Sequence, residues 1–176
     1  MNNMVLQSDA FNFGILTISD AGSKGERKDT SGDGIEERMI IDGFKLTLRE
    51  ILPDEKELIS EKLIQWADSG EADIILTTGG TGLGPRDVTP EATLRIIDFE
   101  VTGISEAMRI KTFDKTPMSI LSRCVSGVRS GCLIINLPGS PKGVKEMLEV
   151  VISVIPHALE MIRGWRTHPV NNIKIR

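Results

Sequence analysis

The chain contains several short, continuous apolar stretches and one stretch in which apolar and polar residues alternate. Dense apolar runs of four to eight residues are typical of strands buried on both faces, whereas alternation is typical of a strand with one exposed face. The sequence therefore predicts buried strands at residues 11–19, 72–78 and 132–137, and an alternating strand at residues 44–52. A shorter apolar stretch at 124–128 fits either an edge strand or one arm of a hairpin.

Between these strands, apolar residues recur at helical spacing. The clearest pattern places Leu58, Ile59, Leu63, Trp66 and Ala67 on one face of a helix. Other helices are predicted at 35–41 and 103–113, and the last is predicted from Pro141 to about Arg163 with a kink near Pro156.

Three helix starts share one device, a Thr or Ser cap followed by proline at the first helical position. They are Thr89-Pro90, Thr116-Pro117 and Ser140-Pro141. The segment from Asp20 to Gly34 shows no period and is rich in glycine, serine and charge, so it is predicted to be a mobile surface loop.

Strands alternate with helices along the chain, which favours a mainly parallel sheet covered on both faces, with right-handed crossovers. The expected fold class is α/β with three α/β/α layers. We expect a single domain over residues 1–176, with a core at about 11–163 and an irregular polar tail from Trp165 to Arg176.

The composition and charge of the chain limit the kinds of binding partner that we expect. The formal net charge is −4 and no basic block occurs, so nucleic acid and anionic membranes are not expected as partners. The longest apolar runs are too short to cross a bilayer, and residues 1–10 do not resemble a secretory signal. Cys124 and Cys132 are expected to be buried free thiols, and a cytoplasmic location is the default expectation.

Polar segments directly follow four of the predicted strands. In an open parallel sheet, ligands bind outside the carboxyl ends of the strands. Because the carboxyl ends of parallel strands lie at one edge, residues far apart in sequence should converge there. The four segments are Ser19-Asp20, Pro53-Asp54, residues 79–87 and residues 138–142.

The segment at 79–87, here called the glycine loop, contains Gly79, Gly80, Gly82 and Gly84. Glycines after a strand and before a helix let backbone amides approach a phosphate closely, and with Thr78 and Thr81 they make this loop a candidate phosphate cradle. The alternative is a turn that merely requires glycine. The spacing fits neither the Walker A motif nor the dinucleotide fingerprint.

Asp54 and Asp87 are the candidate acidic residues of this edge. Each has a structural alternative, because Asp54 could form a capping box with Glu57 and Asp87 could form an Asx turn. Two carboxylates beside a phosphate cradle suit Mg²⁺, which prefers a few carboxylates together with phosphate oxygens and water.

A second anion site is predicted where the last strand meets the last helix. Pro138, Gly139 and Ser140 lead into a helix N-terminus, which favours negative charge, and Lys142 adds a cation. The alternative is a plain strand-to-helix turn with a solvated lysine. Arg86 and Ser122-Arg123 are further candidate anion donors, or ordinary surface residues.

These segments together resemble the molybdopterin adenylyltransferase family of MogA/MoaB type, which also occurs as a domain of gephyrin-type proteins. The matching segments are ILTISD at 15–20, LPDE at 52–55, LTTGGTGLGPRDVTPEAT at 76–93, LSR at 121–123 and LIINLPGSPKGVKE at 133–146. The resemblance covers residues 11–163, nearly the whole chain.

The resemblance implies a three-layer molybdopterin-binding-like fold, a homotrimer, and transfer of AMP from ATP to molybdopterin with Mg²⁺ and release of pyrophosphate. A partner enzyme would then insert molybdate. By this resemblance Asp54 and Asp87 are the catalytic and metal-binding residues, and the glycine loop and residues 138–142 bind nucleotide phosphates. We assign Ser19, Asp20, Ser122 and Arg123 to molybdopterin.

A sister group in the same pathway, some of whose members lack clear adenylyltransferase activity, supplies the alternative of a non-catalytic binder or scaffold. Asp29-Thr30-Ser31-Gly32 resembles a segment of that group. The intact run from Arg86 to Thr93 favours the active type. Two carboxylates beside an anionic ligand would also lower the affinity of a protein that only binds that ligand, because like charges repel.

Overall fold

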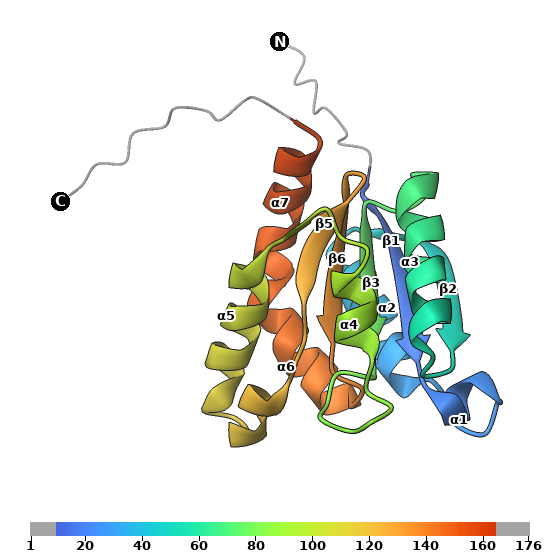
Figure 1. Cartoon of the computed structure of the whole chain (residues 1–176). Helices are drawn as coiled ribbons and strands as arrows, with labels where there is room; N and C mark the ends of the chain where they lie inside the picture. The colour runs from blue at the N-terminus through green and yellow to red at the C-terminus, as the bar shows by residue number, and fades with distance from the viewer. Residues whose placement is uncertain (1–9, 165–176) are drawn as a thin grey trace, which may run out of the picture.

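The computed structural model describes residues 10–164 and contains one sheet with helices on both faces (Figure 1). The strands are arranged in the order β2-β1-β3-β6-β5-β4. The four parallel strands are β1 (Asn12–Ile18), β2 (Lys45–Leu52), β3 (Ile74–Thr78) and β6 (Cys132–Leu137). Two short strands, β5 (Ser126–Arg129) and β4 (Phe99–Glu100), complete one edge with antiparallel pairing.

The helices divide between two buried apolar clusters, one on each face of the sheet. One cluster joins the sheet to α2 (Thr30–Ile41), α5 (Thr102–Phe113), α6 (Pro141–Val151) and α7 (Ile155–Ile162). The other joins it to α3 (Lys56–Ser69) and α4 (Thr89–Leu94), which cover the front face in Figure 1. The expected three-layer α/β/α fold is confirmed.

Most predicted elements are present within a few residues of their expected bounds. The last helix is interrupted as expected: α6 gives way to the 3₁₀ helix η2 (Ile152–Val154), and Pro156 lies in the first turn of α7. The stretch near 124–128 forms β5, which is one arm of a hairpin with β6, and β4 occupies the outer edge. Cys124 and Cys132 are buried free thiols, and burial raises the pKa of Cys132 to about 12.

The predicted loop at 20–34 is wrong over most of its length. It contains the short helix α1 (Asp20–Ser23) and the first turn of α2. Asp29 caps α2 by accepting the Gly32 amide at 2.8 Å. The first turn of α2 consists of weak helix formers, namely Thr30, Ser31 and Gly32, so helix propensity did not predict it. The Asp29 cap and tertiary packing stabilise this helix start.

Of the three predicted caps, the one at Thr89 is wrong, and Thr116 occupies the N-cap position without a capping bond. Val88 precedes α4, and the Thr89 hydroxyl instead donates to the Gly79 carbonyl at 2.9 Å. Thr116 makes no capping bond and precedes a 3₁₀ helix, η1 (Pro117–Leu121). The predicted cap at Ser140 is confirmed, because its hydroxyl accepts the Gly143 amide at 3.1 Å.

One amide side chain is buried at the centre of the sheet. Asn136 on β6 is fully buried. Its Nδ2 donates to the Thr77 hydroxyl at 2.9 Å and the Thr93 hydroxyl at 3.0 Å, and its Oδ1 accepts the Val125 amide at 3.3 Å. These bonds satisfy the amide, and they link β6 to β3, to α4 and to the segment before β5.

Within residues 10–164, no helix combines the length and the apolarity that a membrane span requires.

Candidate functional site

The predicted convergence at the carboxyl edge of the sheet produces one cavity of about 490 Å³, here called the strand-end cavity. The strand ends that line it lie at the lower edge of the sheet in Figure 1. Its lining comes from the ends of β1, β2, β3 and β6 and from the start of α2. The lining residues are Thr17, Ile18, Ser19, Gly22, Arg27, Lys28, Asp29, Thr30, Ser31, Asp54, Thr78, Gly79, Gly80, Gly139, Ser140 and Pro141.

Gly79 and Gly80 form the wall of the cavity and need glycine for different reasons. Gly79 has φ +102°, and a Cβ there would lie 2.2 Å from the Ile18 carbonyl oxygen. Gly80 has φ +63°, and a Cβ there would lie 2.4 Å from Thr89 Oγ1. Because neither glycine has a side chain, the backbone after β3 can pass close to β1, and its main-chain atoms are exposed to the cavity.

The ends of β3 and β6 are bound together next to this wall. The Thr78 hydroxyl donates to the Pro138 carbonyl at 2.7 Å, and the Gly79 amide donates to the Leu137 carbonyl at 3.2 Å. The Ser31 hydroxyl at the start of α2 donates to the Gly139 carbonyl at 2.8 Å. The starts of α2 and α6 therefore both border the cavity, and helix N-termini favour bound anions.

Asp54 lies on the cavity wall and is held to Asp20 by a reciprocal pair of hydrogen bonds. Asp54 Oδ2 accepts the Asp20 amide at 2.8 Å, and Asp20 Oδ1 accepts the Asp54 amide at 3.1 Å. The alternative of a capping box is wrong, because Glu55 occupies the N-cap position of α3 and makes no side-chain cap bond. The Asp54 carboxylate is thus directed to the ends of β1 and β2 rather than to α3.

The electrostatics of the two aspartates differ. Partial burial raises the pKa of Asp54, and the nearby charges of Asp20 and Asp87 raise it further. Hydrogen bonds from Arg86 lower the pKa of Asp20. Arg86 donates to both Asp20 oxygens at 2.8 and 3.0 Å and to Glu55 at 3.0 Å. The negative charge of Asp20 is therefore compensated by arginine, whereas the pKa of Asp54 marks a position where a cation would be favourable.

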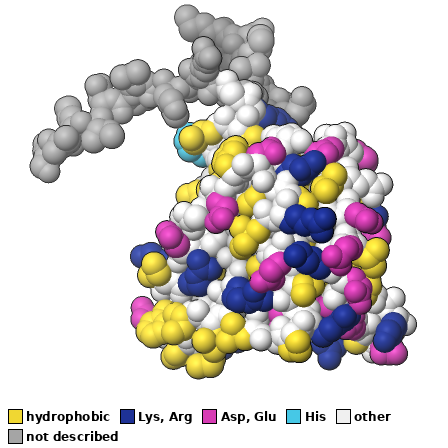
Figure 2. Space-filling model, viewed as in Figure 1, with side chains coloured by type: hydrophobic (Ala, Val, Ile, Leu, Met, Phe, Trp, Pro, Cys, Tyr) yellow, Lys and Arg dark blue, Asp and Glu magenta, His cyan; other side chains and the backbone are white. Residues whose placement is uncertain are grey.

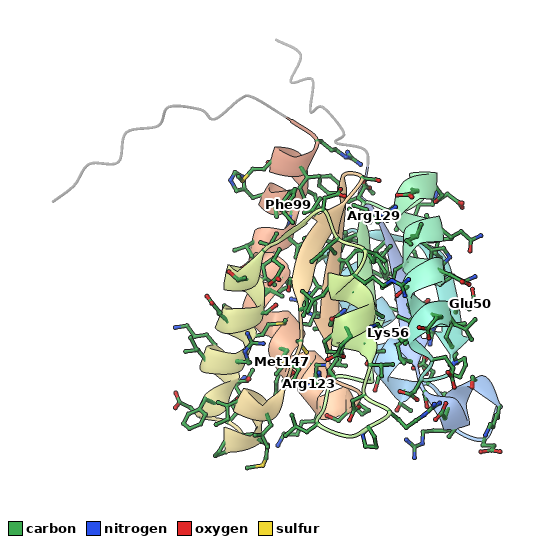
Figure 3. The ribbon with its side chains drawn as sticks, viewed as in Figure 1. Glu50, Lys56, Phe99, Arg123, Arg129 and Met147 are labelled. Atoms are coloured by element: carbon green, nitrogen blue, oxygen red, sulfur yellow. The ribbon has the colours of Figure 1, made fainter. Side chains whose placement is uncertain are left out.

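Asp87 and Arg123 shape the glycine loop through hydrogen bonds to its backbone. Asp87 Oδ2 accepts the Gly84 amide at 2.8 Å, so the carboxylate bonds to an earlier residue of the loop and not to a later one, as the alternative of an Asx turn would require. Arg123 donates to the Gly82 carbonyl at 2.6 Å and to the Asp87 carbonyl at 2.5 Å, and it pairs with Glu91. Figure 3 shows Arg123 beside this loop at the carboxyl edge.

The residues nominated from sequence divide between three places. Ser19, Asp54, Thr78, Gly79, Gly80, Gly139 and Ser140 line the strand-end cavity. Ser122 and Arg123 border a second, polar cavity of about 350 Å³. Asp20, Thr81, Gly82, Asp87, Pro138 and Lys142 line neither cavity.

Sequence reasoning missed the contribution of residues 27–31 to the cavity. Thr30 and Ser31 begin α2, and Asp29 is fixed by the Thr17 hydroxyl at 2.8 Å and by Arg49 at 3.0 Å. The available signal was Asp29, a preferred N-cap residue, followed by the acidic Asp33 in the first turn of the helix.

Two carboxylates, Asp54 and Asp87, lie near each other at this edge of the sheet. Among residues 10–164, no group of three or more His, Cys, Asp or Glu side chains is arranged to hold a metal ion alone. Asp54 and Asp87 are close enough that the charge of one raises the pKa of the other. Two carboxylates with room for phosphate oxygens suit Mg²⁺, which seldom takes an all-protein cage.

Comparison with known proteins places these features in a family. Residues 14–157 match the family model described as "Probable molybdopterin binding domain". A solved structure of the molybdopterin biosynthesis enzyme MoaB from Thermus thermophilus is 52% identical, with a TM-score of 0.81 over 88% of this chain and 97% of that one.

Curated relatives include both short and long proteins. Molybdopterin adenylyltransferase of Helicobacter pylori is 41% identical over 155 residues, which cover 86% of this chain and 87% of that protein. The molybdenum cofactor synthesis protein cinnamon of Drosophila melanogaster is 42% identical over 156 residues, but this chain spans only 26% of its length.

Proposed function

This chain belongs to the molybdopterin-binding domain family, and from that premise we propose that it transfers AMP from ATP to molybdopterin. The products are adenylylated molybdopterin and pyrophosphate. The observation that carries the proposal is the position of Asp54, whose partly buried carboxylate lies on the cavity wall against the backbone of Gly80. A carboxylate of raised pKa in a phosphate-binding cavity suits metal-assisted transfer and is unfavourable for simple anion binding.

In the proposed reaction, a terminal phosphate oxygen of molybdopterin attacks the α-phosphorus of ATP. The new P–O bond forms as the bond from the α-phosphorus to the bridging oxygen breaks, and that oxygen leaves with pyrophosphate. Such transfers depend mainly on positioning and on charge stabilisation. The backbone of Gly79 and Gly80 and the starts of α2 and α6 supply fixed dipoles around the cavity.

Asp54 and Asp87 are the residues that would hold Mg²⁺, with Asp54 on the cavity wall and Asp87 at the end of the glycine loop. Bound Mg²⁺ would neutralise charge on the reacting phosphates. Asp20 fixes Asp54 through their paired hydrogen bonds, and Arg86 compensates the charge of Asp20.

We place molybdopterin between Ser19-Asp20 and Ser122-Arg123. The support for this placement is that Ser19 lines the strand-end cavity while Ser122 and Arg123 border the polar cavity next to the same glycine loop. A substrate that reaches from one cavity to the other would bring its phosphate past Gly80.

The purified chain is expected to release pyrophosphate from ATP and Mg²⁺ only when molybdopterin is present, in proportion to the adenylylated pterin formed. A coupled pyrophosphate assay and mass spectrometry of the pterin would measure both quantities. Tight molybdopterin binding without pyrophosphate release would instead identify the non-catalytic binder or scaffold of the sister group.

We propose further that the chain is a cytoplasmic homotrimer that passes its product to a molybdate-inserting partner enzyme. Cytoplasmic ATP as co-substrate supports the location. Self-association is supported by an exposed apolar patch at the end of α5 and on η1, seen as yellow side chains at the lower left of Figure 2. The patch consists of Ile110, Phe113, Met118, Ile120 and Leu121.

Sedimentation equilibrium is expected to give three times the chain mass. Replacing Met118 with lysine should shift the protein towards monomer, because Met118 is 65% exposed and a charge there would be buried in an interface. The same substitution at Leu83, 69% exposed on the glycine loop, is the control. A wild-type monomer at micromolar concentration would contradict the proposed trimer.

A further inference from the structure

The lining of the strand-end cavity includes two cationic side chains that no sequence motif identified. Four charged residues line it: the carboxylates Asp29 and Asp54 and the cations Arg27 and Lys28. The carboxylate of Asp29 is already compensated by Arg49 at 3.0 Å. A polyanionic substrate that enters this cavity therefore meets Arg27 and Lys28 as its side-chain cations.

Other arginines near the site are occupied with protein partners. Arg86 is bound to Asp20 and Glu55, and Arg49 is bound to Asp29, Asp33 and Glu36. Arg123 donates to carbonyls of the glycine loop and to Glu91. Each of these guanidinium groups holds the fold of the site and would lose protein bonds if it turned towards a ligand.

Arg27 and Lys28 are different. Within residues 10–164, Arg27 has no carboxylate within 4.0 Å, and Lys28 has one solvated pair with Asp33 at 3.4 Å. Exposed pairs of this kind contribute little, so Lys28 can exchange Asp33 for a phosphate at small cost. Arginine and lysine also match phosphate oxygens well.

We propose that Arg27 and Lys28 bind the β- and γ-phosphates of ATP in the strand-end cavity, an inference that rests on the proposed function. They lie in the loop just before α2, whereas Asp54, which lines the same cavity, follows β2. The geometry thus gives one nucleotide two kinds of contact: carboxylate-held metal at the reacting phosphate, and cationic side chains at the phosphates that leave. This assignment replaces Lys142 and Arg86, neither of which lines the cavity.

The test compares ATP with AMP, which lacks the β- and γ-phosphates. Isothermal titration with Mg²⁺ present is expected to show ATP affinity falling about 10- to 100-fold in the R27A/K28A double variant, with AMP affinity changing less than about threefold. The loss should shrink at high salt, because exposed charges are screened. Lys24→Ala, in the same segment but outside the cavity lining, is the matched control.

Steady-state kinetics separate this inference from the proposed function. The double variant should raise the KM for ATP by a similar factor while kcat falls less than about threefold. Wild-type pyrophosphate release with an unchanged KM in the double variant would overturn the inference and leave the proposed function standing. A wild-type chain that binds ATP no better than AMP would overturn the inference directly. Equal loss of affinity for the phosphate of molybdopterin and for ATP would reassign the two cations to a general phosphate role and overturn their assignment to the leaving phosphates.

Discussion

Replacing Asp54 with asparagine is expected to lower kcat at least about 100-fold, the usual effect of removing one electrostatic contact to a transition state. The amide keeps an acceptor for the Asp20 backbone N–H, now held at 2.8 Å, but it loses the charge that a metal ion requires. The pyrophosphate assay measures the loss. Asp114→Asn, an exposed aspartate at the end of α5, is the control and should retain full activity.

The same substitution is expected to raise Tm slightly at neutral pH. Burial raises the pKa of Asp54 in the folded protein, so the folded state holds its proton more tightly than the unfolded chain. The resulting stability is present below the unfolded pKa, near 3.8, and is lost as pH rises through the higher folded pKa. Above that pH the ionised carboxylate destabilises the fold, and asparagine removes this cost.

Thermal unfolding at pH 4 and pH 8 would check the sign. The Tm difference between the Asp54→Asn variant and wild-type protein should be larger at pH 8 than at pH 4. A lower Tm at pH 8 for the Asp54 variant, together with unchanged kcat, would show that Asp54 serves the fold and not the reaction.

Gly79→Ala is expected to cost at least about 3 kcal/mol of stability, which lowers Tm by roughly 6–12 °C in a chain of this size. Two effects add. The φ of +102° is strained for alanine, and its Cβ would lie 2.2 Å from the Ile18 carbonyl oxygen, so β1 or β3 must shift. The shift would displace the cavity wall, so activity should fall even at temperatures where the variant is folded.

Gly25→Ala separates the strain from the clash. Gly25 has a similar left-handed φ of +74°, but a Cβ there meets nothing within 4 Å. It should cost only about 1 kcal/mol and leave activity intact. Equal losses of Tm at the two positions would show that β1 and β3 do not need their close approach at Gly79.

The elements predicted well from sequence are those whose signal is local. The strands that carry the site are apolar runs with polar ends, so residues such as Asp54 and Gly79 could be placed at one edge before any coordinates. Glycine after a strand likewise indicates a backbone conformation that other residues rarely adopt, and the positive φ values of Gly79 and Gly80 confirm it.

What could not be predicted depends on partners distant in sequence. β4 is only Phe99–Glu100, and it is a strand because β5 pairs with it. Thr89 resembles a cap, but the carbonyl of Gly79 takes its hydroxyl. Arg123 could be nominated as a ligand donor, but its bonds to glycine-loop carbonyls 36 and 41 residues away could not be predicted. Arg27 and Lys28 border the cavity because Asp29 anchors the start of α2 to Thr17 on β1.

Asn136 fixes the register of β6 against β3. The strands IILTT and CLIINL are buried on both faces, so sliding one past the other by a residue or two would still cover apolar side chains. Such a slide would part the Asn136 amide from the hydroxyls of Thr77 and Thr93 and leave buried donors unpaired. It would also carry Gly139 about 3.3 Å per residue away from Gly79. One buried amide therefore fixes the spacing at the edge that borders the strand-end cavity, because it sets how far the turns after β3 and β6 stand from each other.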